Sequence, residues 1–250
     1  MRKYGLIGYP LGHSFSRKYF GEKFKNERIM DCSYENYPLT SIHLLPELLS
    51  NEPEICGLNV TIPYKSEVIR YLDSIDKESS EIGSVNVIKI RRSVGKIYLS
   101  GFNSDIAGIR DSLMPYMRSD LKNAMVLGTG GSSRSVCYML RNIGLSVTLV
   151  SRNRGEGVIS YEDITPEFIS VTGLIVNTTP LGMYPAVDAK PDIDYSSLGK
   201  NHILFDLVYN PEVTKFLEAG LSRGCTVITG LKMLHSQAER AWEIWNDDNL

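Results

Sequence analysis

Short apolar runs alternate with amphipathic stretches through the first third of the chain. The apolar runs predict strands at residues 4–7, 34–37 and 55–60, and the stretches with helical spacing predict helices at residues 16–25, 41–49 and 63–72. Pro63 is expected to begin the third helix, because proline suits a first helical turn. Residues 86–90 and 96–99 flank Ser93-Val-Gly95 and predict a hairpin. Alternating strands and helices indicate an α/β layer structure.

The pattern changes after a predicted helix at residues 105–117, which we expect to stop around Pro115. A strand at 124–127, a helix at 132–142 capped by Gly144, and a strand at 146–150 form a predicted βαβ unit. Further strands are expected at residues 174–177, 203–205 and 226–228, and an amphipathic helix at 231–245 closes the chain. This second half resembles a doubly wound nucleotide-binding fold.

A glycine-rich turn joins the first strand and helix of that unit. It reads Gly128-Thr-Gly-Gly-Ser-Ser-Arg134. A pyrophosphate needs backbone N–H groups at a helix N-terminus and no side chain in its way, which glycines provide. The turn therefore predicts a dinucleotide site at Gly128, Thr129, Gly130, Gly131 and Ser132. A plain tight turn is the alternative.

The end of the second strand of the unit indicates which dinucleotide binds. An NAD site usually has an acidic residue there, which binds the ribose hydroxyl. This chain has Ser151-Arg-Asn-Arg154 instead. Arg152 and Arg154 would attract a 2′-phosphate, so the loop of Ser151, Arg152, Asn153 and Arg154 favours NADP over NAD. The alternative is an ordinary basic surface loop.

Polar side chains cluster at several predicted strand ends before the glycine turn. The clusters are Ser14 with Ser16, then Asn59, Thr61 and Lys65, then Asn86, and finally Asn103 with Asp105. Each has an ordinary explanation as a helix cap, a turn residue or a surface lysine. Open α/β sheets nevertheless bind ligands at their strand ends. A lysine and a carboxylate that manage a proton, beside a cofactor that carries hydride, would interconvert a ketone and an alcohol.

Composition narrows the class of protein. The chain has 250 residues, 42% hydrophobic and 22% charged, with a net charge of -2 and no long basic stripe, so we expect no nucleic-acid partner. The cysteines Cys32, Cys56, Cys137 and Cys225 are scattered and predict reduced thiols. Early glycines and a proline interrupt the N-terminal apolar run, and no stretch approaches the roughly 18 apolar residues of a membrane span. We expect a cytoplasmic protein. The four histidines lack metal-ligand spacing, so no metal is predicted.

Eight segments in order are similar to the shikimate dehydrogenase family. They are Gly12-His-Ser-Phe-Ser16, Asn59-Val-Thr-Ile-Pro-Tyr-Lys65, Gly83-Ser-Val-Asn86, Asn103-Ser-Asp105, Gly128-Thr-Gly-Gly131, Asn177-Thr-Thr-Pro-Leu-Gly-Met183, Asp206-Leu-Val-Tyr209 and Gly230-Leu-Lys-Met-Leu-His-Ser-Gln237. The resemblance implies two domains. Residues 1–104, completed by residues 230–250, would form an α/β substrate domain, and residues 105–229 a Rossmann-type NADP-binding domain.

The resemblance also assigns roles to single residues. Lys65 and Asp105 would be the catalytic pair, with Asp105 also contacting the substrate. Ser14, Ser16 and Tyr209 would hold the substrate carboxylate, while Thr61, Asn86 and Gln237 would bind ring hydroxyls. Asn177 and Thr178 would lie near the cofactor, with Leu207 and Gly230 close to the nicotinamide.

Some positions depart from the family pattern. Arg17 stands where the family usually has proline, and Val87 where a threonine is expected. The largest departure follows Arg154, where Gly155-Glu-Gly157 predicts that the usual crossover helix on the adenine side of the site is missing.

The activity implied is the reversible NADPH-dependent reduction of 3-dehydroshikimate to shikimate, in the biosynthesis of chorismate and the aromatic amino acids. A quinate or dual quinate/shikimate dehydrogenase is the nearest alternative, and a non-catalytic nucleotide-binding regulator is a more distant one. We expect a monomer or a homodimer. We also expect the protein to bind its small-molecule substrate and no membrane.

Overall fold

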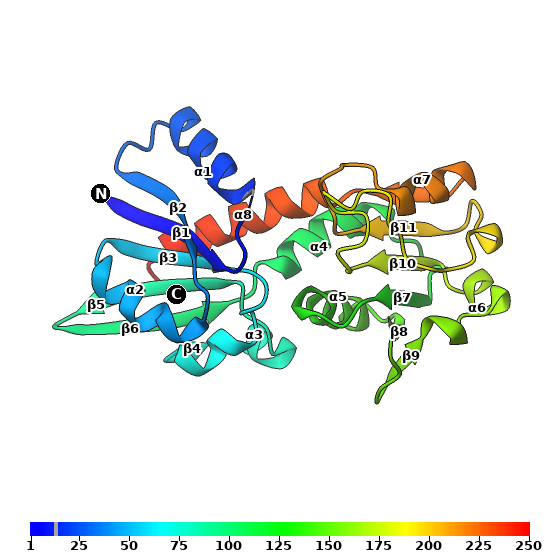
Figure 1. Cartoon of the computed structure of the whole chain (residues 1–250), viewed down its shortest axis with the longest axis horizontal. Helices are drawn as coiled ribbons and strands as arrows, with labels where there is room; N and C mark the ends of the chain where they lie inside the picture. Colours follow the sequence, from blue (N-terminus) through cyan, green and yellow to red (C-terminus); the bar gives the residue numbers. More distant parts are fainter. Residues whose placement is uncertain (13–14) are drawn as a thin grey trace. The chain divides into compact units, whose positions relative to one another are not determined.

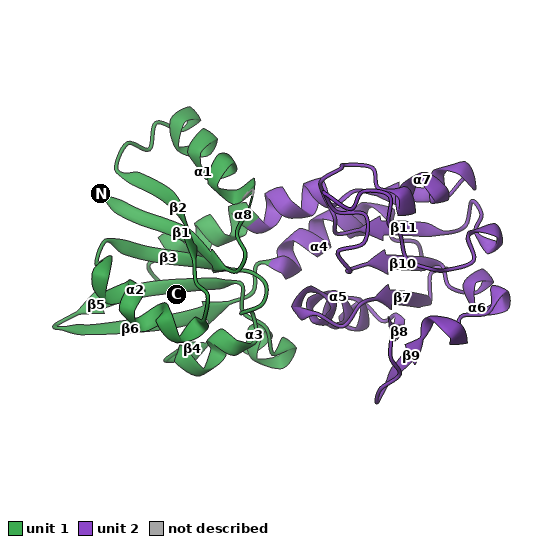
Figure 2. Ribbon diagram, viewed as in Figure 1, with its two compact units in different colours: residues 1–104, 238–250 green, residues 105–237 purple. Residues whose placement is uncertain are grey.

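The computed structural model describes residues 1–12 and 15–250 and confirms the predicted α/β class. The chain forms two compact units, Met1–Ser104 with Ala238–Leu250, and Asp105–Gln237 (Figure 2). The division passes through the last helix, α8 (Gly230–Asn246), whereas the sequence analysis assigned all of residues 230–250 to the first domain. The assignment of substrate to one unit and cofactor to the other stays a prediction.

The first unit is built on a six-stranded mixed sheet of order β2-β1-β3-β5-β6-β4 (Figure 1). Its strands are β1 (Arg2–Gly8), β2 (Cys32–Pro38), β3 (Ile55–Val60), β4 (Ser74–Ile75), β5 (Val87–Ser93) and β6 (Lys96–Phe102). β5 runs antiparallel to β3 and β6, and the other pairs are parallel. The predicted hairpin is confirmed. Its two turn residues, Val94 and Gly95, have positive φ angles of 44° and 75°, as a tight hairpin turn of this kind requires.

Helices cover both faces of this sheet. On one face α1 (Phe15–Asn26) and the end of α8 bury Phe20, Phe24 and Trp245 against Tyr4 and Tyr34. On the other, the 3-10 helix η1 (Ile42–Leu44) and α2 (Leu45–Asn51) pack on Leu58 and Ile88. Val87, the departure from the expected threonine, is fully buried in the first of these apolar clusters. The short helix α3 (Lys77–Ile82) precedes β5 and was not predicted.

The segment after β3 differs from its prediction. Pro63 does not begin a helix. Residues 62–66 form turns, and only a 3-10 helix, η2 (Glu67–Tyr71), follows. The reason is visible in the backbone, because the Lys65 carbonyl accepts a hydrogen bond from the Val85 N–H at 2.8 Å. In an α-helix this carbonyl would accept from the N–H four residues later. The bond to the distant Val85 takes the place of that helical hydrogen bond.

The second unit contains a six-stranded, fully parallel sheet of order β12-β11-β10-β7-β8-β9. Its strands are β7 (Asn123–Leu127), β8 (Ser146–Ser151), β9 (Val158–Ser160), β10 (Leu174–Asn177), β11 (Ile203–Asp206) and β12 (Thr226–Ile228). Counted along the chain, this is the 3-2-1-4-5-6 order of the Rossmann fold, and the predicted nucleotide-binding architecture is confirmed. The order reverses between β7 and β10, where such folds bind their ligands.

Helices lie on both faces of this sheet as well. The longer ones are α4 (Asp105–Leu113), α5 (Gly131–Asn142) and α7 (Lys215–Ser222), and the shorter ones are α6 (Pro166–Ser170) and the 3-10 helices η3 (Met114–Tyr116), η4 (Tyr161–Asp163) and η5 (Tyr195–Ser197). α5 contacts β7, β8 and α4, while α6 and α7 share an apolar cluster with the opposite face. Gly108 lets α4 approach α8 closely, since a Cβ there would lie 2.5 Å from the Met233 carbonyl oxygen.

The link between β8 and β9 contains no helix, as predicted. Residues 152–157, all of which the structure describes, form bends and turns, and Gly155 and Val158 exchange two backbone hydrogen bonds of 3.1 Å. β9 was missed because three residues are too few for a periodic signal. The last residue of β9, Ser160, is also the N-cap of η4. Its backbone N–H donates to the Asp163 carboxylate at 2.8 Å.

Candidate functional site

In the first unit, the turn after β3 carries two of the predicted site residues. The Thr61 N–H donates to the Ile7 carbonyl at 2.9 Å, which fixes Thr61 at the carboxyl end of β1. Lys65 is half-buried at the end of the same turn, and its carbonyl is bonded to Val85. The backbone of Val60 also donates to the Asn86 carbonyl at 2.9 Å. Thr61, Lys65 and Asn86 therefore lie on neighbouring segments at one end of the sheet.

Asn86 is buried, and its side chain is engaged with the segment that follows β6. Its oxygen accepts from the Ser104 N–H at 2.7 Å, and its Nδ2 donates to the Ser104 hydroxyl at 3.1 Å. Asn103 donates to the Ser84 carbonyl at 2.9 Å. These contacts fix the chain just before Asp105, a buried carboxylate in the first turn of α4. A negative charge at a helix N-terminus is favourable.

Of the two predicted substrate serines near the start of α1, the structure describes one. Ser16 is half-buried in the first turn of α1. Ser14 lies outside the described residues. Arg17, the departure from the family's proline, forms a surface ion pair with Glu35 at 3.0 Å.

In the second unit, the glycine turn has the backbone that a dinucleotide needs. Gly128 has a φ of 112°, and a Cβ there would lie 2.7 Å from the Thr178 hydroxyl. Gly130 precedes the first residue of α5, and a Cβ there would meet open space. Thr129 and Gly130 are exposed, whereas Gly131 and Ser132 are half-buried. The N-terminus of a 12-residue helix thus begins at a glycine-rich turn whose residues Thr129 and Gly130 are exposed.

Thr178 links the glycine turn to the neighbouring strand β10. Its hydroxyl donates to the Leu127 carbonyl at 2.6 Å and lies 2.6 Å from the Ser133 hydroxyl of α5. Its backbone N–H bonds the same carbonyl at 2.9 Å. The structure therefore brings Thr178 against the turn at the point where the strand order reverses.

The two arginines of the loop after β8 differ in their surroundings. Arg154 donates through Nε to Asp163 at 3.0 Å, and a second guanidinium nitrogen contacts the other oxygen of the same carboxylate. Arg152 and Asn153 are exposed, and Ser151 is half-buried. Arg152 makes no such competing contact in the described part of the chain, so the geometry favours it as a phosphate partner.

Asp206 is a buried carboxylate at the end of β11 to which the sequence analysis gave no role. It is 0% exposed and accepts hydrogen bonds from Asn177 Nδ2 at 3.0 Å, the Val208 N–H at 3.0 Å and the Thr214 hydroxyl at 2.6 Å. Burial raises the pKa of Asp206 to about 6, and the three hydrogen bonds oppose that rise. An acid at the end of an apolar strand was the available signal.

This carboxylate supports the segment that follows β11. The Leu207 N–H donates to the Asn177 carbonyl at 3.0 Å, and a Cβ on Gly230 would lie 2.5 Å from the Leu207 carbonyl oxygen. Leu207 and Gly230 are therefore close together. Tyr209 is half-buried, and burial raises its pKa. Gln237 donates to the Leu234 carbonyl within α8 at 3.0 Å.

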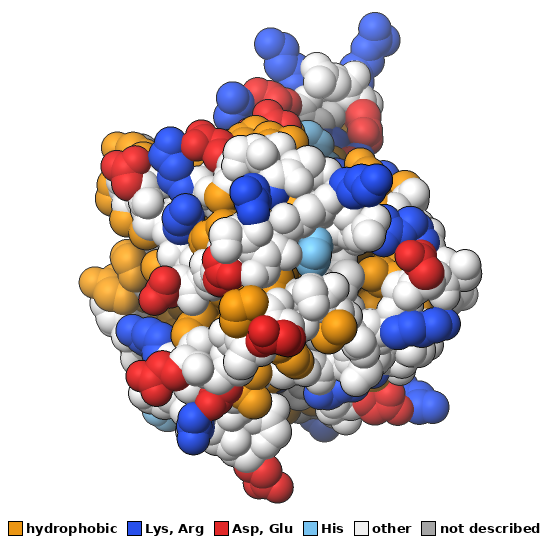
Figure 3. Space-filling model, turned by 90° about the vertical axis from the view of Figure 1, so that its right-hand side faces the viewer, with side chains coloured by type: hydrophobic (Ala, Val, Ile, Leu, Met, Phe, Trp, Pro, Cys, Tyr) orange, Lys and Arg blue, Asp and Glu red, His pale blue; other side chains and the backbone are white. Residues whose placement is uncertain are grey.

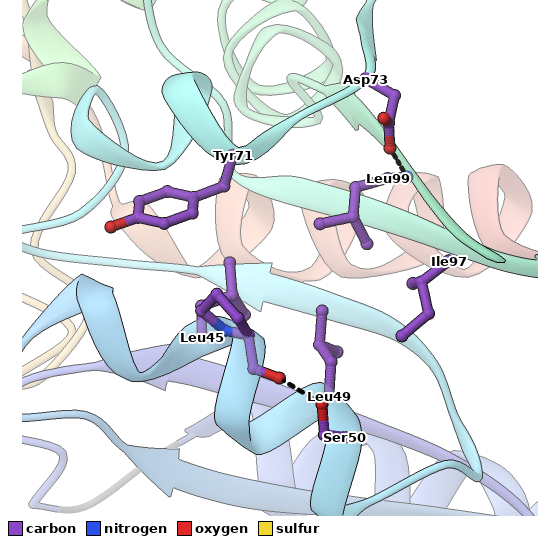
Figure 4. Close-up of a pocket in the computed structure, with 8 residues that line it drawn as sticks. Leu45, Leu49, Ser50, Tyr71, Asp73, Ile97 and Leu99 are labelled. Atoms are coloured by element: carbon purple, nitrogen blue, oxygen red, sulfur yellow. Dashed lines mark hydrogen bonds between the residues drawn. The ribbon is translucent and has the colours of Figure 1, made fainter. Parts of the chain in front are cut away.

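A pocket of about 280 Å³ lies elsewhere in the first unit, between α2, η2 and β6 (Figure 4). Its lining is mostly apolar and holds none of the predicted site residues. Its polar side chains are engaged with the backbone, since Asp73 accepts from the Leu99 N–H at 2.7 Å and Ser50 donates to the Pro46 carbonyl at 2.9 Å (Figure 4). The pocket thus presents no polar group that calls for a ligand.

Surface charge and cation sites add little to this picture. On the face drawn in Figure 3, acidic and basic side chains are intermixed. Asp194 caps η5 by accepting from the Ser196 N–H at 2.9 Å. Among the described residues, no cluster of three potential metal ligands is present, and no described helix is long and apolar enough to cross a membrane. The thiols of all four cysteines are free, as predicted.

Comparisons with known proteins relate this chain to one enzyme family. Residues 6–88 match the family model described as the shikimate dehydrogenase substrate binding domain. A shikimate dehydrogenase (NADP(+)) of Clostridium beijerinckii is 38% identical over 261 residues, which cover 100% of this chain and 94% of the relative.

Solved structures give the same result. A shikimate dehydrogenase in complex with NADP+ has a TM-score of 0.87 and 30% identity over 98% of this chain and 90% of that chain. The enzyme of Thermus thermophilus, solved in complex with NADP(H) and shikimate, has a TM-score of 0.83 and 29% identity over 98% of this chain and 94% of its own.

Proposed function

The chain belongs to the shikimate dehydrogenase family, and from this premise we propose that it catalyses the reversible NADPH-dependent reduction of 3-dehydroshikimate to shikimate. It is an NADP-dependent oxidoreductase. The observation that carries the proposal is the glycine turn after β7, which stands at the reversal point of a Rossmann sheet. The reaction belongs to the biosynthesis of chorismate and the aromatic amino acids.

The residues around the turn fit NADP. Gly128, Thr129, Gly130, Gly131 and Ser132 would surround the pyrophosphate at the N-terminus of α5, and a Cβ on Gly130 would meet open space. Exposed Arg152 would pair with the 2′-phosphate, helped by Ser151 and Asn153. Arg154 would have to share its guanidinium with Asp163. Thr178, Leu207 and Gly230 would border the nicotinamide, which supplies the hydride when NADPH is bound.

The proton chemistry is assigned to Lys65 and Asp105. As the ketone is reduced, charge builds on its oxygen, and the Lys65 ammonium would donate a hydrogen bond and then the proton to that atom. Asp105 would accept a hydrogen bond from the hydroxyl that this reduction forms, and it would orient the Lys65 side chain. Two facts support this pairing: Lys65 is held by Val85 through its carbonyl, and Asp105 directly follows the segment bonded to Asn86.

Substrate binding is assigned to the polar residues around the same strand ends. Ser14, Ser16 and Tyr209 would hold the carboxylate, while Thr61, Asn86 and Gln237 would bind ring hydroxyls. The location of Thr61 beside Asn86 supports this assignment for two of them. A cytoplasmic location, supported by the free thiols, and a monomeric or homodimeric state remain predictions.

The test is NADPH oxidation with 3-dehydroshikimate, followed by absorbance. We expect turnover that requires both reactants, and much slower reduction of NADP or NAD by quinate. If purified protein oxidises no NADPH with 3-dehydroshikimate while quinate reduces NAD rapidly, the quinate alternative replaces the proposal. If the protein binds NADPH but turns over neither compound, it is a nucleotide-binding protein of this family rather than a dehydrogenase.

A further inference from the structure

The last residues of two neighbouring strands form a buried polar pair in the second unit. Asn177 ends β10 and Asp206 ends β11, and the two residues lie opposite each other in the register of these parallel strands (Figure 1). Both are 0% exposed, and Asn177 Nδ2 donates to the Asp206 carboxylate at 3.0 Å. The same carboxylate accepts from the Val208 N–H at 3.0 Å and from the Thr214 hydroxyl at 2.6 Å.

All three donors to the Asp206 carboxylate are neutral groups. They are a side-chain amide, a backbone N–H and a hydroxyl, and no ion pair among the described residues includes Asp206. A buried charge is normally paired with an opposite charge, because its desolvation is costly. Burial raises the pKa of Asp206 to about 6, so above that pH the folded protein holds a buried negative charge that no described cation balances. Near a ligand site, such a charge is a candidate for a role in binding.

The loop bonded to this carboxylate is the one predicted to border the nicotinamide. Leu207 follows Asp206 directly, and the N–H that Asp206 accepts belongs to the peptide that joins Leu207 to Val208. The Leu207 N–H donates to the Asn177 carbonyl at 3.0 Å, and a Cβ on Gly230 would lie 2.5 Å from the Leu207 carbonyl oxygen. A ring bordered by Leu207 would therefore lie about one residue's breadth from the carboxylate.

The nicotinamide ring is positively charged in NADP+ and neutral in NADPH, whereas the phosphates are the same in both. Resting on the proposed function, in which Leu207 borders this ring, we propose that the Asp206 carboxylate is the counter-charge of the oxidised nicotinamide and raises the affinity for NADP+ relative to NADPH. Asp206 acts through space and touches neither cofactor nor substrate, because it is fully buried. The same charge favours the reduction of 3-dehydroshikimate within the bound complex, since that direction ends with the oxidised ring.

The test is Asp206→Asn, which removes the charge with little change in shape. The Kd values for NADP+ and NADPH are measured by titration calorimetry at about pH 8, where Asp206 is ionised. We expect the ratio of the Kd for NADP+ to the Kd for NADPH to rise about tenfold, the size of one charge pair at short range in a medium of intermediate dielectric constant. The Kd for 2′-phospho-ADP-ribose, which lacks the nicotinamide, should change as the Kd for NADPH does.

Two further variants separate the charge from other effects. Asp120→Asn removes the same charge from a side chain of the second unit that is 72% exposed and lies before β7. It should leave the ratio at the wild-type value, because water and salt screen this charge. Thr214→Val removes one neutral donor and keeps the charge of Asp206, so it should also leave the ratio unchanged, even where it lowers stability.

A second neutral variant covers the case in which Asp206→Asn does not fold. Asp206→Ser removes the same charge with a smaller side chain, whose hydroxyl still accepts a hydrogen bond and leaves space for a water molecule. The ratio of the two Kd values should again rise about tenfold.

The outcomes separate the inference from the proposed function. A folded neutral variant with the wild-type ratio overturns the inference, as does an equal rise of the ratio in Asp120→Asn or Thr214→Val. Wild-type protein that binds neither NADP+ nor NADPH overturns the proposed function and removes the premise of the inference as well. Wild type that reduces 3-dehydroshikimate, beside a neutral variant with an unchanged ratio, overturns the inference alone.

Discussion

The two units provide the predicted site by different physical means. The first supplies buried polar side chains that already hydrogen-bond neighbouring segments, such as Asn59, Asn86 and Asn103. The second supplies a turn whose important feature is its glycines, of which Gly130 is exposed and has open space beside it. Substitutions in the first unit should therefore change substrate handling and turnover, whereas those at the glycine turn should change the affinity for the cofactor.

The largest expected effect is in the first unit. Lys65→Ala should lower kcat by about 10²–10⁴, the usual contribution of a general acid, with little change in unfolding free energy because Lys65 is only half-buried. The measurement is turnover at saturating NADPH and 3-dehydroshikimate beside a denaturant titration. Lys77→Ala, on a side chain that is 91% exposed in the same unit, serves as the control and should retain wild-type turnover. Near-normal turnover in Lys65→Ala would remove this lysine from the chemistry.

The matching change in the second unit is Gly128→Ala. A side chain there meets a φ of 112° and lies 2.7 Å from the Thr178 hydroxyl, at a cost of about 2 kcal/mol. We expect the KM for NADPH to rise about thirtyfold, with a small effect on the KM for 3-dehydroshikimate. Gly144→Ala is the control, because Gly144 has a φ of 88° and open space. It should lose stability without losing cofactor affinity, and equal KM changes in both variants would contradict the assignment of the turn.

The ends of the strands show how far local sequence patterns predict this molecule. β3 and β10 were predicted at their observed bounds because each is a short, mostly apolar run. The helix predicted from Pro63 failed because the Lys65 carbonyl is bonded to Val85, a contact that no local pattern contains. Helix α7 was missed, and so was β9. Long-range bonding decided the failure at Pro63, whereas β9 is too short to give a periodic signal.

The candidate site shows the same limit. The glycine turn was predictable because its chemistry lies in consecutive residues. The pairing of Arg154 with Asp163 joins two loops around β9, and the contacts of Asp206 with Asn177 and Thr214 join three segments of the second unit. Motif spacing identified which residues lie near strand ends. It did not show which of these side chains already hydrogen-bond another residue of the protein.

Arg152→Ala tests the exposed edge of the second unit. Loss of one charge-assisted hydrogen bond should raise the KM for NADPH about tenfold and leave the KM for NADH nearly unchanged. Arg154→Ala is the comparison and should have a smaller effect, since Asp163 already holds that guanidinium. Equal losses for NADPH and NADH in Arg152→Ala would end the 2′-phosphate assignment.

The last prediction concerns stability in place of kinetics and separates the units by their response to pH. The buried polar groups named above in the first unit are neutral amides, whereas Asp206 in the second unit can ionise. Burial raises its pKa from 3.8 to about 6. Between these values the unfolded chain loses the proton before the folded chain does, so the contribution of Asp206 to stability is complete below about pH 4. It falls as pH rises to about 6 and is constant above that, for a total of about 3 kcal/mol at most.

Asp206→Asn should abolish this fall, because an amide cannot ionise yet keeps an acceptor for Asn177 and Val208 and a donor toward Thr214. The measurement is the difference in unfolding free energy between wild type and variant from pH 4 to pH 7. Asp194→Asn is the control and should give a flat difference across this window. Hydrogen bonds from Ser196 and Ser197 lower the pKa of Asp194, so its stabilising contribution is constant above the unfolded pKa of 3.8 and is lost only as pH falls below that value. A flat difference for Asp206→Asn across this window would mean that the Asp206 carboxylate of the folded protein is already charged at pH 4. The two units would then no longer differ in how their stability responds to pH.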